Sequence, residues 1–166
     1  MLVKLLLLGG VGIAALIAYD HGRSIDETDV RAHYRTQLEA LRAFDEEAIC
    51  AGIADDYVLE LTERTPGGDA SETLDGPESC DVSRKMLGFM RQMSEQTGGL
   101  VTIDVSYTIG TVTISPDGRK ATVESTSTAK LGDRLISRSR GREELSRSFW
   151  RTRSHGGTAQ VWSYGG

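Results

Sequence analysis

The sequence lacks the residue patterns that commonly mark a catalytic or cofactor site. It holds no Ser-His-Asp signature, no glycine-rich phosphate loop and no cluster of residues with metal-ligand spacing. Its few histidines are scattered: we expect His33 on the surface and His155 in a glycine-flanked turn. No two acid–base residues form a recognisable dyad, so the sequence predicts no catalytic residue, no metal ion and no cofactor.

Proline and cysteine are also scarce. Only three prolines occur, and no low-complexity tract or internal repeat is visible, which is typical of one folded domain with a modest core. The two cysteines, Cys50 and Cys80, have no histidine nearby, which argues against a zinc site or a catalytic thiol. In an oxidising compartment they would form a disulfide; the alternative is a pair of buried free thiols.

Basic residues are sparse in the first half of the chain. Positions 20–81 hold 17 acidic and 5 basic residues, a balance of −12, whereas positions 82–166 hold 7 acidic and 13 basic residues, a balance of +6. We therefore expect the two halves to lie near each other and to compensate. Basic and aromatic residues are not interleaved, so nucleic acid is not an expected partner.

The N-terminal segment is the one long apolar run. From residue 1 to residue 19 only Lys4 is charged, and about 18 helical residues would span roughly 27 Å, enough for a thin bilayer. A signal-peptidase cut after Ala18 would put Leu16 at the −3 position, which is a poor cleavage site. The pattern therefore favours an uncleaved membrane anchor; the alternative is secretion after cleavage.

This anchor defines the expected domain organisation. We expect a transmembrane signal anchor over residues 1–19, a juxtamembrane linker over 20–27 and one exported domain over 28–166. Lys4 lies ahead of the apolar run and an acidic stretch follows it, so the N-terminus would stay in the cytoplasm. The sequence thus predicts a single-pass protein of the bacterial inner membrane with its C-terminal domain in the periplasm.

Helical periodicity governs two stretches of that domain. Residues 24–53 predict one helix, with an apolar stripe made by Val30, Tyr34, Leu38 and Leu41. Residues 80–99 predict a second helix, which ends at two glycines. Between the helices, residues 54–64 alternate like a short strand, and the polar residues 65–79 are expected to form a loop.

Strand periodicity governs the rest of the chain. Alternation predicts four long antiparallel strands over residues 100–114, 119–131, 134–153 and 158–164, joined by tight turns. In the first of them the apolar residues occupy odd positions up to Ile109 and even positions from Val112 onward. An extra residue at Gly110 explains the slip as a β-bulge, which bends the strand so that the sheet curls around the helices.

This order of elements, together with the bulged strand, resembles the nuclear transport factor 2-like (NTF2-like, or SnoaL-like) superfamily. The resemblance implies an α+β fold in which two or three helices pack on a bent antiparallel sheet of four long strands, the cystatin/NTF2-like cone. It also implies a pocket between sheet and helices, which members use for catalysis, for ligand binding or only as part of a dimeric scaffold.

Aromatic residues are candidates for the lining of such a pocket. They are Tyr34, Tyr57, Tyr107, Trp150 and Trp162, although packing in the core would explain them equally well. Asp104 lies on the bent strand, but its parity puts it with the polar face, so we expect it to be solvated.

Arginine is concentrated near the C-terminus. Arg138, Arg140 and Arg142 share one strand face, and Arg151 follows them. They form a candidate docking surface for an acidic protein partner, a second copy of the chain or anionic lipid. The alternative is a solvated sheet face balanced by Glu143 and Glu144.

Together these features favour a membrane-anchored periplasmic interaction or assembly module without catalytic activity, which dimerises or docks through its arginine-rich sheet face. The alternative is a small-molecule-binding or enzymatic cone of the isomerase or dehydratase type. That alternative predicts an apolar pocket that holds a paired carboxylate or histidine.

Overall fold

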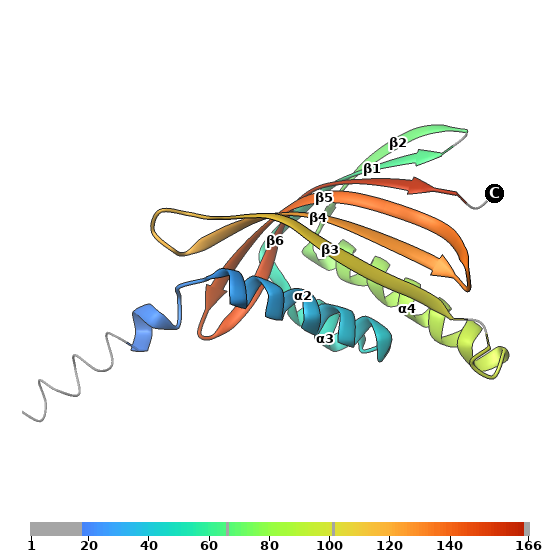
Figure 1. Ribbon diagram of the computed structural model, residues 1–166, viewed down its shortest axis with the longest axis horizontal. Coiled ribbons are helices and arrows are strands. Elements are labelled where there is room, and N and C mark those ends of the chain that lie inside the picture. The colour runs from blue at the N-terminus through green and yellow to red at the C-terminus, as the bar shows by residue number, and fades with distance from the viewer. Residues whose placement is uncertain (1–17, 66, 101, 165–166) are drawn as a thin grey trace, which may run out of the picture.

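A computed structural model describes residues 18–65, 67–100 and 102–164. Figure 1 shows one strongly bent sheet with the helices gathered on one side of it. Three helices have both ends among the described residues: α2 (Glu27–Arg42), α3 (Glu46–Ala51) and α4 (Gly76–Gln96). The strands are β1 (Ile53–Thr65), β2 (Gly68–Asp75), β3 (Ile103–Ile114), β4 (Lys120–Leu131), β5 (Arg134–Ser148) and β6 (Arg151–Ser163).

The sheet has six strands in the order β2-β1-β6-β5-β4-β3, so the expectation of four strands was wrong. Every neighbouring pair is antiparallel except β1 and β6, which run parallel. This parallel pair joins the β1–β2 hairpin to the meander formed by β3 to β6. The predicted α+β cone is confirmed, with a wider sheet than expected.

The additional strand β2 replaces the predicted polar loop. It pairs with β1 from Val58↔Asp75 to Thr65↔Gly68, and nearly all of its residues are exposed. Its side chains show no apolar alternation because neither face of this edge hairpin is deeply buried. Backbone hydrogen bonds, which the side-chain pattern does not reveal, therefore define the strand.

The predicted strand over residues 134–153 is in fact two strands. β5 ends at Ser148, and Phe149 and Trp150 make the turn with positive φ angles of 48° and 67°. The glycines expected to turn, Gly156 and Gly157, lie inside β6 instead. A Cβ at Gly156 would collide with the carbonyl oxygen of Val58, so these glycines allow β1 to approach closely.

The predicted bulge at Gly110 is confirmed. Ile109 pairs with Ser125 whereas Val112 pairs with Val123, so two residues of β3 lie opposite one residue of β4. The bend carries both halves of β3 onto the core. Ile109, Val112 and Ile114 pack there against a buried cluster of Ile25, Val30, Tyr34, Ala121, Val123 and Leu145.

The predicted first helix is split into α2 and α3. Asp26 caps α2 in a capping box with Asp29, and the chain then turns at Phe44, whose φ is 54°. Asp45 begins the new helix by accepting a hydrogen bond from the Ala48 N–H at 2.9 Å. α3 ends at Ala51, and Gly52 is its C-cap.

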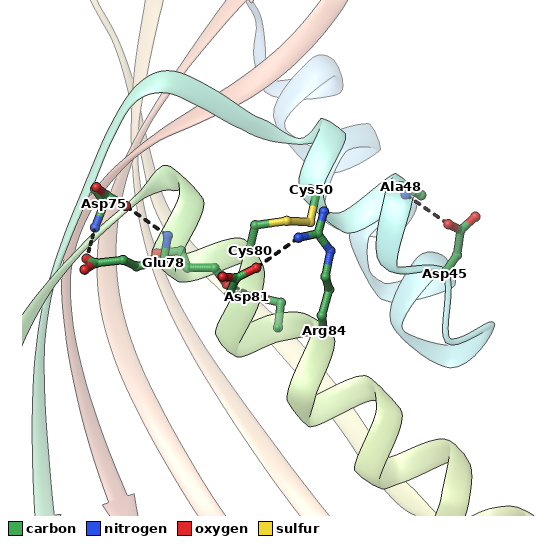
Figure 2. Close-up of a disulfide and its surroundings, with 10 residues drawn as sticks. Asp45, Ala48, Cys50, Asp75, Glu78, Cys80, Asp81 and Arg84 are labelled. Atoms are coloured by element: carbon green, nitrogen blue, oxygen red, sulfur yellow. Dashed lines mark hydrogen bonds and ion pairs between the residues drawn. A yellow bond between two sulfur atoms is a disulfide. The ribbon is translucent and has the colours of Figure 1, made fainter.

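Cys50 and Cys80 lie at disulfide distance, with their Cα atoms 5.4 Å apart, and their sulfur atoms are bonded (Figure 2). Cys50 belongs to α3, and Cys80 lies near the start of α4, which Asp75 and Glu78 cap. The bond therefore fixes the short helix α3 to the long helix α4.

The expected anchor over residues 1–19 falls outside the described residues except for its last two positions. Among the helices that the structure describes, none is long and apolar enough to cross a membrane.

Candidate functional site

A cavity of about 410 Å³ lies between the concave face of the sheet and helices α2 and α4. Its floor consists of small side chains on the central strands: Ser125, Ser127, Ser139, Gly141, Gly157 and Ala159. A solid core would fill this space with large apolar residues. Small residues at the centre of the sheet therefore keep the cone open.

The walls of the cavity are mainly apolar. They are formed by Leu41, Ile49, Ile53, Leu59, Leu61, Leu74, Val82, Met86 and Leu87. Val82 and Met86 on α4 are about half exposed even though they line the cavity, so the cavity opens to solvent along this helix. An apolar ligand could therefore enter beside α4 and cover these side chains.

One carboxylate, that of Glu143, reaches this cavity from β5. In the ladder it lies between Gly157 of β6 and Val123 of β4. The Tyr34 hydroxyl on α2 donates a hydrogen bond of 2.6 Å to Glu143 Oε2. This charge-assisted bond links helix and sheet and fixes the direction of the carboxylate.

Three tyrosines surround the carboxylate. The rings of Tyr34 and Tyr107 meet edge to face with centroids 5.7 Å apart, and Tyr57 also lines the cavity. Burial first, and the negative charge of Glu143 second, raises the pKa of all three phenols. The tyrosines thus remain protonated at neutral pH.

His33 also lines the cavity, so its expected place on the surface was wrong. Burial lowers its pKa, and the nearby Glu143 carboxylate opposes that shift without cancelling it. The imidazole is therefore mainly neutral at pH 7. The site thus combines the Glu143 carboxylate with one neutral imidazole and three phenols.

Only three of the five predicted pocket aromatics line the cavity. Tyr34, Tyr57 and Tyr107 line the cavity, whereas neither tryptophan does. Trp150 lies in the β5–β6 turn, where its ring contacts His21 at 5.4 Å between centroids. Trp162 lies near Arg64, whose guanidinium carbon is 5.9 Å from the ring centroid.

Of the candidate docking arginines, Arg138, Arg140 and Arg151 do not line the cone cavity, whereas Arg142 is among the residues at its edge. Arg138, Arg140 and Arg142 are exposed on β5, on the side opposite the small floor residues. None of the three takes part in an ion pair with any residue that the structure describes. Arg151 lies apart from them, at the start of β6. Asp104 is exposed, as expected, 4.0 Å from Arg42.

Glu143 is the functional candidate that the sequence reading missed. It was assigned to charge balance on the arginine face, but its parity with the buried Leu145 puts it on the opposite, concave face. Strict alternation along "SRSRGREEL" would have found it. That signal was masked by the arginines on both sides.

Solved structures share this architecture. A conserved protein from Planctomyces limnophilus is 20% identical with a TM-score of 0.54, over 82% of this chain and 95% of that chain. An NTF2-like protein of unknown function from Pseudomonas putida is 14% identical with a TM-score of 0.53, over 81% and 84%. A protein with a cystatin-like fold from Nostoc punctiforme is 15% identical with a TM-score of 0.50, over 83% and 90%.

No protein-family model and no curated protein matches the chain. At the identities given above, the structural likeness shows the fold alone. The chain has the α+β cone fold of NTF2-like, cystatin-like proteins.

Proposed function

We propose that the cone binds a small, largely apolar molecule that presents an organic ammonium group to Glu143. The observation that carries the proposal is the Glu143 carboxylate, held by Tyr34 at 2.6 Å inside an apolar cavity. A carboxylate in such surroundings is stabilised by a cation. Among the described residues, Glu143 has no ion-pair partner, so the ligand would supply the charge.

The aromatic lining supports the same class of ligand. Cations are attracted to the faces of aromatic rings, and Tyr34, Tyr57 and Tyr107 surround the carboxylate. The volume of about 410 Å³ lies within the usual range for small-molecule sites. The apolar walls would hold the hydrocarbon part of the ligand.

The proposal is tested by thermal-shift and calorimetric titration with aryl-alkyl amines and their isosteric alcohols. We expect the amines to bind and to raise the melting temperature, and the alcohols to bind at least tenfold more weakly. Glu143→Gln should abolish this preference. Glu144→Gln, next in sequence but on the opposite strand face, is the matched control and should keep it. Equal binding of amines and alcohols by the unmodified protein would refute the proposal.

Proton transfer is a second candidate for this cavity, of the isomerase or dehydratase type. Glu143 is the only carboxylate that lines the cavity among the described residues, and the phenols beside it stay protonated. A carboxylate base next to phenolic donors suits proton abstraction beside a carbonyl group. Deuterium uptake from solvent into apolar ketones, lost in Glu143→Gln, would support it; no uptake in the unmodified protein would exclude it for those ketones.

Docking through Arg138, Arg140 and Arg142 is a separate proposal, supported by their exposure and their lack of ion pairs among the described residues. A homodimer or an acidic protein partner would pair with such a face. Reversing two charges, with Arg138→Glu and Arg140→Glu, should shift the protein to a smaller species in analytical ultracentrifugation. An unchanged mass would count against a dimer through this face.

We also propose that the domain is exported and tethered to the inner membrane. The apolar residues 5–18 and the Cys50–Cys80 pair support this location. Fractionation should find the intact chain in membranes, accessible to protease added to spheroplasts. Recovery of a shortened chain in the soluble periplasmic fraction would favour secretion instead.

A further inference from the structure

Three polar side chains from three different strands meet on the sheet away from the cone. Ser146 Oγ of β5 lies 2.7 Å from His155 Nε2 of β6, and His155 Nδ1 lies 2.5 Å from Asp56 Oδ1 of β1. The sequence holds no Ser-His-Asp signature because these residues are spread over almost a hundred positions. Such triads are recognised by geometry and not by order along the chain.

Irregular pairing brings these residues together. The β1–β6 register shifts between Ile53 and Val58, and the β5–β6 register shifts between Glu143 and Leu145. Asp56 and His155 lie within those two irregular stretches. Bulges of this kind redirect side chains and occur often beside active sites.

The cluster borders a hollow of about 300 Å³ that is separate from the cone. The His155 side chain is 21% exposed and that of Asp56 is 74% exposed, so a substrate could reach both. Ser146 follows the buried Leu145 on β5 and therefore points to the other face of the sheet. Asp56, Ser146 and His155 line this hollow together with Arg151 and Arg153.

The basic residues around this hollow indicate the charge of its substrate. Arg151 and Arg153 line it and form no ion pair with any described residue. Lys120, the β4 neighbour of Ser146, is instead held by Glu144 at 2.6 Å. Two unpaired guanidinium groups favour a substrate that carries a carboxylate.

We propose that Ser146, His155 and Asp56 form a hydrolytic triad for small carboxylate-bearing esters. Ser146 Oγ bonds to the ester carbonyl carbon while its proton passes to His155 Nε2, and the alcohol leaves with that proton. Water then adds to the acyl-serine, again losing its proton to His155. The carboxylic acid departs and Ser146 recovers its hydroxyl proton.

In this reaction Ser146 and His155 are catalytic residues and Asp56 is a positioning residue. Its carboxylate accepts the Nδ1–H hydrogen bond and so leaves a lone pair on Nε2 that faces Ser146. Arg151 and Arg153 hold the carboxylate of the substrate.

Hydrolysis of 4-nitrophenyl hydrogen glutarate by the full chain tests the proposal, with 4-nitrophenyl pentanoate as the uncharged ester of equal length. We expect the charged ester to react at least tenfold faster in kcat/KM. Ser146→Ala and His155→Gln should each lower kcat by at least about 100-fold. Ser71→Ala, an exposed strand serine outside both cavities, is the control and should keep full activity.

Two further measurements distinguish a role of these residues in catalysis from a role in folding. Asp56→Asn should lower kcat with little change in KM, and Asp56→Glu should restore part of the loss. A fluorophosphonate probe on the unmodified protein should label Ser146, as located by peptide mass spectrometry. Absence of labelling at Ser146, or a rate that survives in a folded Ser146→Ala variant, would overturn the proposal.

Discussion

At the scale of single residues, one hydrogen bond fixes the centre of the cone. The Tyr34 hydroxyl and the Glu143 carboxylate lie 109 positions apart in sequence and 2.6 Å apart in space. Because the acceptor is charged, its loss leaves a poorly solvated carboxylate without its donor. This bond therefore stabilises the fold and fixes the direction of the carboxylate.

Tyr34→Phe should consequently destabilise the fold by about 2 kcal/mol. Urea unfolding followed by circular dichroism measures this free energy. Tyr107→Phe is the control, because it changes a neighbouring phenol that lacks this bond, and it should cost less than half as much. Equal losses from the two substitutions would show that the Tyr34–Glu143 bond contributes little.

The buried phenols also predict a dependence of stability on alkaline pH. The pKa values of Tyr34, Tyr57 and Tyr107 are raised in the folded state, so the folded chain keeps protons that the unfolded chain releases above pH of about 10. The free energy of unfolding should fall as pH rises above 10. Urea midpoints between pH 8 and 11 measure the slope, which should flatten in the triple Tyr→Phe variant.

Residue types alone allowed part of this site to be predicted. Three of the five aromatic candidates, Tyr34, Tyr57 and Tyr107, line the cavity because aromatic residues are favoured in pocket walls. Glu143 and His33 were assigned to the surface because charged and polar residues usually lie there. Their burial depends on the curvature of the whole sheet, which a local pattern does not contain.

At the scale of elements, the disulfide secures the short helix α3. With only six residues, this helix is too short to be stable alone, and Cys50 bonds it to Cys80 of α4. Replacing both cysteines by serine should lower the free energy of unfolding by about 3 kcal/mol. Dithiothreitol should lower the urea midpoint of the unmodified chain but leave that of the double variant unchanged.

The strands could be predicted where apolar side chains that face the core alternate with polar ones. The β5–β6 turn and the exposed strand β2 have no such pattern and were not predicted. The slip from Ile109 to Val112 revealed the bulge because the core-facing residues of β3 are apolar both before and after Gly110. The turn at Phe149 and Trp150 was missed because positive φ angles are rare for aromatic residues. Gly156 and Gly157 suggested a turn, but they lack side chains because β1 passes close to them.

At the scale of the whole molecule, ion pairs join the acidic and the basic half of the chain. Asp29 pairs with Arg147 at 2.7 Å, Glu46 with Arg91 at 3.2 Å, and Asp20 with Arg119 at 3.5 Å. The expected compensation between the halves is thus seen in specific contacts. The Asp29–Arg147 pair is the most buried of them, with side chains 20% and 16% exposed.

We therefore expect the loss of stability on substituting an arginine to be larger for the buried pair than for an exposed one. Arg147→Met leaves Asp29 without its partner and should cost about 2 kcal/mol of stability. Arg119→Met breaks an exposed pair and should cost less than about 0.5 kcal/mol. Thermal unfolding at low and at high salt checks this, because only the exposed pair should be strongly screened. Similar costs for both would mean that burial does not govern these pairs.

The parallel contact between β1 and β6 has a consequence for how the molecule assembles. Until residues 151–163 are in place, the hairpin of β1 and β2 has no neighbour in the sheet, and the floor of the cone is missing one strand. The sheet is complete only when β6, nearly a hundred positions after β1, has paired with it. Folding therefore depends on contacts between distant parts of the chain, which makes it slow. A chain interrupted at the Phe149–Trp150 turn would leave β1 and β5 each with an unpaired edge. Such edges favour aggregation and binding by chaperones.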